Sequence, residues 1–532
     1  MYAPFRIGTL AAPAPSASPV AAPADGPTAS QIRFLATGLT ASFLVSVSAQ
    51  FITTNLADIQ GAVAATADEA SWIATAYTMA NFTGVVASGL LVRTFGARRF
   101  LVVNAAVFAL AALLCAWTVS LPQIIAMRAL QGVAAGGFGP LAFVSVFMTM
   151  TGKRLPFGLL LLSFVLLFPV TLGPIVSAYV EAGIGWRSLF AAQVLIGAAI
   201  VAAGLAFAPR QPVNWPGLKA DWVAVLLLSF SLAMLMLVLS QGTRRFWFDS
   251  EMIRWATIAG IGGAAGFVFL MVASPMPLIA PRLLLERKFG IPIALNLVFR
   301  AGFAVTTYLV PQFLAIVQGF RPLDVAALLA WGAVAQALTL PVVWWLLNRF
   351  DGRLVMGFGL LLCGAGTGLL AAVTGLAAVD QFRFATILFC IGQLLFLAPD
   401  LMIGSSTLKP ADLPTASLAF NLTTLGGTTF GVALVSNLVT EREKFHSSVL
   451  TEKISLYDSL DADRIAALAS AFAGRLSDDA MATARAVAAL SAAGRKQAWV
   501  LAFGDGFALT AIILAVSAIG VVAIGRCLPL SR

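Results

Sequence analysis

The chain has 532 residues, of which 60% are hydrophobic and 11% charged, and its mean hydropathy is +0.94. A soluble protein of this length needs more polar residues to cover its surface, so the composition excludes an ordinary soluble globular protein. The net charge of +10 comes from basic residues scattered between apolar runs, which is typical of membrane topology signals rather than of a nucleic-acid-binding surface.

The N-terminal segment is predicted to be a disordered cytoplasmic tail covering residues 1–32. Residues 1–30 are rich in Ala, Pro and Ser, and their prolines interrupt any apolar core that a cleaved signal peptide would need. The first membrane helix would therefore act as an uncleaved signal anchor.

Apolar runs of about twenty residues follow, and each is long enough to cross a bilayer as a helix. Their hydrophobicity is continuous rather than alternating, which favours helices over a β-barrel. The predicted spans are 33–58, 71–92, 100–119, 122–148, 157–180, 188–208, 221–240, 252–273, 289–312, 323–347, 354–377, 382–405, 415–439 and 498–525.

These spans predict an all-α polytopic membrane protein with about fourteen helices. Two six-helix bundles are expected at 33–208 and 289–525, with two inserted helices and their linkers at 209–288. The second bundle includes a long, Ala-rich polar connection at 440–497, which is predicted to lie outside the membrane and to contain amphipathic helix. Residues 526–532 are expected to form a second cytoplasmic tail.

The orientation is predicted from the Lys and Arg residues near the helix ends. Seventeen of them fall on one side of the predicted membrane, and six fall in the short loops of the other side. The long connection 440–497 is left out of this comparison, because long loops cross the membrane regardless of charge. Both chain ends are therefore predicted to be cytoplasmic.

A short basic turn occurs twice in the sequence. Arg93-Thr-Phe-Gly96 follows the second predicted helix, and Arg349-Phe-Asp-Gly352 follows the tenth. Each turn would lie between the second and third helix of a six-helix block. Parallel repeats related by an axis along the membrane normal would produce this arrangement.

The chain resembles the major facilitator superfamily, and most strongly its fourteen-helix drug–proton antiporter (multidrug efflux) branch. The resemblance covers nearly the whole chain after residue 33. The segments that carry it are Gly89–Arg99, Arg128–Gly132, Gly173–Ile175, Trp186–Phe190, Pro311–Leu314 and Leu425–Ala433.

The resemblance implies a secondary active transporter that exports amphipathic small molecules, such as drugs, toxins or aromatic acids, by alternating access and driven by proton entry. It implies a multi-pass protein of a bacterial plasma (inner) membrane. The expected partners are the substrate, protons and the lipid bilayer, with a periplasmic adaptor and outer-membrane channel as candidates and no nucleic acid. The long connection 440–497 is a candidate dock for the adaptor.

No cofactor, metal or enzyme activity is expected, because the sequence has no phosphate-binding glycine loop with lysine and no zinc or serine-hydrolase signature. Two alternative functions stay open. One is transport of a specific metabolite or siderophore, with or without proton coupling. The other is a non-transporting membrane receptor or assembly partner.

Several polar residues are expected to line the translocation path. Gln50, Thr54 and Asp58 are spaced to share one face of the first helix, and Asn55 lies beside that face. Arg128 and Arg300 fall inside predicted spans, where an unpaired charge is costly, so they are candidates for substrate contact. For Arg128, a structural hydrogen-bonding role is an equal alternative.

Proton coupling is expected to depend on Asp58 or Asp505, because Gln50 stands where the resemblance implies an acid. Asp400 is predicted to be a charge near a helix end that reaches water. His446 is predicted to be exposed and incidental, with proton sensing as a lesser alternative. The resemblance also implies conformational motifs at Gly89, Arg93, Gly96, Arg98, Gly173 and Pro174.

Overall fold

The computed structural model describes residues 27–215, 222–274, 278–452, 459–473 and 478–524, and among these residues there are helices and turns but no strand. The long apolar runs fold as helices because a helix pairs its backbone N–H and C=O groups within one segment. The all-α fold expected from the sequence is confirmed.

The first half of the chain forms α1 (Ala29–Thr54), α2 (Leu56–Ala62), α3 (Ala67–Ala116), α4 (Leu121–Gly136), α5 (Phe138–Thr149), η1 (Gly152–Arg154), α6 (Leu155–Ile184) and α7 (Arg187–Phe207). A pair of helices follows, α9 (Trp222–Gln241) and α10 (Glu251–Ala273), joined through η2 (Trp247–Asp249).

The second half begins with α11 (Pro281–Leu285), α12 (Arg287–Ala301), the π turn η3 (Val305–Leu309) and α13 (Val310–Gln318). It continues with α14 (Pro322–Arg349), α15 (Gly352–Leu369), α16 (Val379–Ser405), η4 (Pro410–Asp412), α17 (Leu413–Glu452), α18 (Ser459–Ala473), α19 (Asp479–Gly520) and η5 (Val521–Ile524).

The described residues contain 13 helices that are long and apolar enough to cross a membrane, and one of them, α3, has 50 residues. Gly96, inside α3, has φ 81° and ψ 156°, so the helix is interrupted there. Ala70 near the start of α3 and Cys115 near its end belong to one apolar cluster. The chain therefore reverses at Gly96, and α3 supplies two antiparallel spans. When α3 is counted as two spans, the described residues contain fourteen, and the prediction of about fourteen spans is confirmed.

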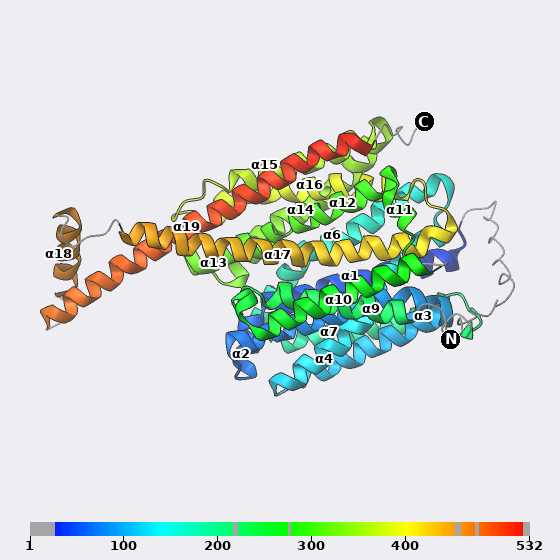
Figure 1. Cartoon of the computed structure of the whole chain (residues 1–532), viewed down its shortest axis with the longest axis horizontal. Helices are drawn as coiled ribbons and strands as arrows, with labels where there is room; N and C mark the ends of the chain where they lie inside the picture. Colours follow the sequence, from blue (N-terminus) through cyan, green and yellow to red (C-terminus); the bar gives the residue numbers. More distant parts are fainter. Residues whose placement is uncertain (1–26, 216–221, 275–277, 453–458, 474–477, 525–532) are drawn as a thin grey trace, which may run out of the picture.

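Most of the long helices run along the long axis of the molecule, and they form two groups that lie side by side (Figure 1). Helices α3, α4 and α7 lie along one edge, and α15, α16 and α19 lie along the other. The groups meet where α6 packs against α14 and α16, and where α5 packs against α17. At this boundary Phe143 stacks on Phe420 with their ring centroids 5.7 Å apart, and the Ser417 hydroxyl donates to the Pro140 carbonyl at 3.2 Å.

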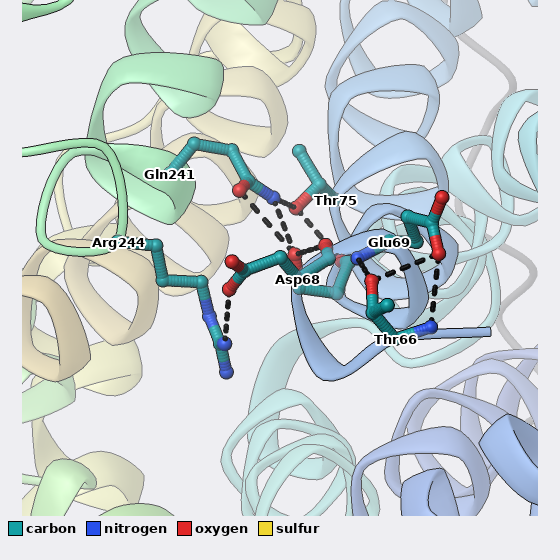
Figure 2. Close-up of polar contacts among 7 residues, drawn as sticks. Thr66, Asp68, Glu69, Thr75, Gln241 and Arg244 are labelled. Atoms are coloured by element: carbon teal, nitrogen blue, oxygen red, sulfur yellow. Dashed lines mark hydrogen bonds and ion pairs between the residues drawn. The ribbon is translucent and has the colours of Figure 1, made fainter.

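The inserted helix α9 is fixed to the start of α3 by polar contacts (Figure 2). Gln241, at the end of α9, donates through Nε2 to the hydroxyls of Thr75 at 2.7 Å and Ser71 at 3.1 Å. Arg244 forms an ion pair with Asp68 at 3.2 Å. Because Gln241 is buried, its bonds are shielded from water and contribute more than the exposed ion pair.

The inserted pair also contacts the second half. Trp247, between α9 and α10, donates from Nε1 to the side-chain oxygen of Asn437 on α17 at 2.7 Å. An apolar cluster joins Val85 of α3, Ala224 of α9 and Leu418 of α17. The pair α9–α10 therefore packs against both halves of the molecule.

Helices α17 and α19 are longer than a membrane span. They have 40 and 42 residues, which corresponds to about 60 Å each, against about 30 Å for the hydrocarbon core of a bilayer. Both run past the rest of the bundle at one end, where Ile465 of α18 packs on Ala486 and Leu490 of α19 (Figure 1). The start of α1 and η5 lie toward the opposite end.

Candidate functional site

A small cavity lies where the two halves meet. It has room for about one water molecule, so a larger ligand can enter only if the halves move apart. The wall is mostly apolar, with three polar side chains, and it is formed by Gly139 and Phe143 of α5, Leu162 and Leu166 of α6, Asn296 of α12, Leu397 and Leu401 of α16, and Phe420, Asn421 and Thr424 of α17.

Arg300 lies one turn beyond Asn296 on α12 and is 1% exposed. Its guanidinium carbon lies 4.9 Å from the centre of the Phe303 ring. Two of its nitrogens, Nε and Nη2, are buried without a hydrogen-bond partner among the described residues. Asn296 donates from Nδ2 to the Thr423 hydroxyl at 2.9 Å, while its own Oδ1 also lacks a partner there.

Asp400 is fully buried on α16, which corrects the expectation that its carboxylate reaches water at a helix end. The helix continues to Ser405, and Gly404 packs close to Pro292 of α12, so the side chain is covered. Neither carboxylate oxygen has a hydrogen-bond partner within the described ranges. Asp400 interacts electrostatically with Arg300, whereas Asp505 is bonded to Arg442 and His446.

Arg128 is buried in a polar network inside the first half. It donates through Nη1 to Gln131 Oε1 at 2.6 Å and lies 3.9 Å above the Tyr77 ring. Gln131 in turn donates to Gln193 Oε1 at 2.8 Å, and the Ser48 hydroxyl donates to the same oxygen at 2.8 Å. The network therefore connects α1, α3, α4 and α7, and Arg128 lies outside the wall of the central cavity.

The predicted polar face of the first helix is interrupted. The backbone at Asn55 has φ −107° and ψ 22°, so α1 ends at Thr54 and Asp58 lies in the separate helix α2, where it is exposed. The expectation that Asp58 continues the face of Gln50 and Thr54 is wrong. Asn55 is buried and donates from Nδ2 to the Ser177 hydroxyl of α6 at 2.8 Å.

Gln50 lies at a close approach between α1 and α6. A Cβ atom added at Gly173 would come within 2.7 Å of the Gln50 Cβ, so only glycine allows this spacing. Pro174 follows within the same helix and removes one backbone donor. The structure thus places Gln50, Gly173 and Pro174 together at the α1–α6 contact.

Asp505 lies on α19 in an ion-pair cluster with two residues of α17. Its Oδ2 accepts from Arg442 Nε at 2.5 Å and lies 2.8 Å from His446 Nε2. The His446 side chain is 16% exposed, which corrects the expectation of an exposed histidine without contacts. The carboxylate is 38% exposed, and the cluster is absent from the wall of the central cavity.

The sequence and the fold were compared with those of known proteins. The sequence profile of the Major Facilitator Superfamily matches residues 38–298. The colistin resistance protein EmrB of Acinetobacter baumannii is 21% identical, over 80% of this chain and 83% of its own length. The multidrug export protein EmrB of Escherichia coli is 23% identical, over 79% of this chain and 82% of its own length.

Solved structures give the same fold. The proton:xylose symporter XylE bound to 6-bromo-6-deoxy-D-glucose superposes with a TM-score of 0.54 at 12% identity, over 91% of this chain and 94% of that one. A double Trp mutant of XylE gives a TM-score of 0.57 at 13% identity, and the superposition covers 94% of this chain and 98% of that one. The chain belongs to the major facilitator superfamily. It is a multi-pass membrane transporter of this superfamily and not an enzyme.

The segment Gly89–Arg99, which resembles the superfamily's signature loop, contains the reversal inside α3. At Gly96 the Gln211 side chain accepts from the Ala97 backbone N–H at 3.2 Å, and Arg99 donates to the Gln211 carbonyl at 3.2 Å. These two hydrogen bonds attach the segment that follows α7 to the turn at Gly96. Arg93 and Gly89 are exposed, and Arg98 is half-buried.

Replacing Gly96 with alanine is expected to lower the free energy of unfolding by about 1–3 kcal/mol, because its φ and ψ lie in a region that is essentially restricted to glycine. The added Cβ would also approach the Gln211 side chain. Thermal unfolding of the purified transporter in detergent measures the loss.

Gly89→Ala is the matched control in the same motif. A Cβ at Gly89 meets no atom within 4 Å, and the residue is helical, so the stability should stay unchanged or rise slightly. Equal stability of Gly96→Ala and the wild type would contradict the assignment of the reversal to Gly96.

Proposed function

We propose that the protein is a proton-coupled exporter of amphipathic small molecules that works by alternating access. The observation that carries this proposal is the central cavity, whose wall comes from α5 and α6 of one half and from α12, α16 and α17 of the other. If the halves rock against each other, such a cavity opens to one side of the membrane at a time. Its apolar and aromatic wall suits an amphipathic ligand.

The direction of transport is proposed from the relatives. Two of them are named as colistin resistance and multidrug export proteins, and the fatty acid resistance protein FarB of Neisseria gonorrhoeae is 23% identical over 75% of this chain and 79% of its own length. One of these names states export and the other two state resistance, which export of the toxic compound would produce. Proton drive is proposed because the chain has no sequence motif for binding ATP.

The proposal is tested in a bacterial strain that lacks its own drug-export pumps. Expression of the protein should lower the accumulation of a neutral or weakly acidic aromatic probe, and an uncoupler should restore accumulation. Expression that lowers accumulation equally with and without the uncoupler would contradict proton drive. Expression without any effect over a broad panel of amphipaths would contradict export.

The charges near the cavity favour neutral or weakly acidic ligands over quaternary cations. The cavity wall contributes no carboxylate in the part of the chain that the structure describes, and Arg300 and Asp400 lie beside it. While Asp400 holds a proton, a permanent cation would meet the uncompensated charge of Arg300 in a medium of low dielectric constant, where like charges repel strongly. We therefore propose drugs, toxins and aromatic acids without permanent positive charge as substrates.

The protein is proposed to lie in a bacterial inner membrane with both termini in the cytoplasm and α18 outside. Reporter fusions test this orientation: a cytoplasmic reporter should be active after the C-terminus, and a periplasmic reporter should be active near Ser459. The expected result follows from the excess of Lys and Arg on the predicted inner side. A cytoplasmic signal near Ser459 would reverse the orientation.

A periplasmic adaptor with an outer-membrane channel is the proposed partner. The extensions of α17 and α19 with α18 protrude beyond the bundle at one end and supply a surface outside the expected membrane region (Figure 1). Leu460 and Met481 on this surface are largely exposed. An adaptor that covers them would remove apolar surface from water.

A further inference from the structure

Five buried polar atoms without hydrogen-bond partners gather beside the central cavity, counted over the residues that the structure describes. They are Oδ1 of Asn296, Nε and Nη2 of Arg300, and both carboxylate oxygens of Asp400. A buried polar atom without a partner costs about 1–3 kcal/mol. Such a cluster in a transporter indicates that another molecule supplies the missing partners during part of the cycle.

The position of the three residues connects them to the cavity. Asn296 is part of the wall, and Arg300 lies one turn further along α12. Asp400 lies between Leu397 and Leu401, which both belong to the wall. The ring of Phe299, next to Arg300, packs 4.3 Å from the ring of Phe396, so the two helices are in direct contact at this level.

We propose that Asn296, Arg300 and Asp400 form the polar end of the substrate site, and that the substrate and the proton compete there for the Asp400 carboxylate. This inference rests on the proposed proton-coupled export and names its ligand chemistry and its proton-carrying residue. It assigns proton coupling to a buried carboxylate in place of the two candidates expected from the sequence, Asp58 and Asp505.

The unpaired atoms define the ligand. Arg300 offers two donors, whereas Asp400 and Asn296 offer acceptors, so the matching polar group must both donate and accept hydrogen bonds. A carboxamide or a protonated carboxylic acid carries both a hydrogen-bond donor and an acceptor on the same carbon atom. Its aromatic body would pack against Phe143 and Phe420 in the cavity. A trimethylammonium group has no N–H donor for the oxygens of Asp400 and Asn296, and it has no acceptor for the donors of Arg300.

The transport step then conserves atoms and charge. On the cytoplasmic side the ligand N–H or O–H bonds to the Asp400 carboxylate, and the proton on that carboxylate leaves to cytoplasmic water. Arg300 balances the remaining negative charge. On the external side a proton returns to Asp400, the hydrogen bond is lost and the ligand leaves. One proton enters for each ligand exported, and no covalent bond in the ligand changes.

Few other charges surround Asp400. Arg300 of α12 is the charged group that interacts with it. Asp351 and Arg353, near the start of α15, are bonded to each other at 2.9 Å. The remaining ionisable side chains on the helices packed against α16 are Arg287 and Lys288 at the start of α12, Asp324 and Arg349 of α14, Cys363 of α15, and Tyr179 and Glu181 near the far end of α6.

Proton release on ligand binding tests the inference. Naphthamide is added to the purified full-length protein in weakly buffered detergent solution containing a pH indicator. The wild type should release about one proton per bound molecule. Asp400→Asn should bind naphthamide within about tenfold of the wild-type affinity and release no protons. Asp505→Asn is the matched control and should release protons like the wild type. Release that persists in Asp400→Asn, or that disappears in Asp505→Asn instead, overturns the assignment.

A second measurement on the wild type avoids any folding defect of the variant. Dicyclohexylcarbodiimide reacts with protonated carboxyls in apolar surroundings, and mass spectrometry locates the product. Asp400 should be labelled, and naphthamide should protect it. An unlabelled Asp400 overturns the inference. Proton release and protection in a protein that exports nothing from cells would instead overturn the proposed function and leave the site in place.

Discussion

Replacing Arg128 with alanine is expected to lower the free energy of unfolding by about 2–4 kcal/mol. The variant loses the charge-assisted hydrogen bond to Gln131 and the contact with the Tyr77 ring, both of which are buried. It also leaves Gln131 Oε1 without its donor. Because this network connects α1, α3, α4 and α7, the loss should affect the whole first half. Chemical or thermal unfolding of the purified protein measures it.

Arg187→Ala is the control for Arg128→Ala. Arg187 also lies over an aromatic ring, at 4.4 Å from the centre of the Trp186 ring, but it is exposed, so its removal should cost less than about 1 kcal/mol. The folded fraction of Arg128→Ala should still bind naphthamide, because Arg128 lies outside the cavity wall. An Arg128→Ala protein with wild-type stability and lost binding would assign Arg128 to the substrate path instead.

Replacing Arg300 with glutamine is expected to weaken the binding of naphthoic acid by about 10- to 100-fold, which corresponds to the loss of one charge-assisted hydrogen bond in a buried site. Two unpaired nitrogens of Arg300 are available to a carboxylate or carboxylic acid in the wild type. Binding is measured by the fluorescence of the naphthalene ring with the purified protein in detergent.

Naphthyltrimethylammonium has the same ring and serves as the matched cationic ligand. Its weak binding should stay the same or become tighter in Arg300→Gln, because the substitution removes the repulsion by the guanidinium and takes away no hydrogen bond. An equal loss of both ligands would reduce Arg300 to a structural residue. Tight binding and export of the cation by the wild type would contradict the proposed preference for neutral and weakly acidic ligands.

The helices were predictable because each apolar run carries its own signal, independent of what it packs against. The reversal at Gly96 was also predictable, since the basic turn around it interrupts two apolar runs. Amphipathic helix was predicted within 440–497, but its continuation of α17 and α19 was not, because the exposed turns of these extensions are polar and resemble a loop in the sequence. Arg442 and His446 lie 63 and 59 residues from Asp505, so their cluster depends on how these two helices pair.

The candidate site could be predicted only in part, because burial of one side chain depends on distant segments. Arg300 is recognisable as a charge well inside an apolar run. Asp400 lies near the end of its run, and its burial depends on how α16 packs among α6, α12, α14 and α15. Asp58 was assigned to the first helix because the spacing allowed it, but the backbone at Asn55 ends that helix first.

Transport by the purified protein in liposomes shows directly whether a proton gradient drives export. Liposomes containing the protein are loaded with buffer so that a pH gradient can be imposed across the membrane, and naphthamide movement is followed by fluorescence. Naphthamide is expected to move against its own gradient toward the acidic compartment, and an uncoupler should stop this movement. Asp400→Asn should exchange naphthamide without responding to the gradient. Wild-type transport that ignores the pH gradient would contradict proton-coupled export.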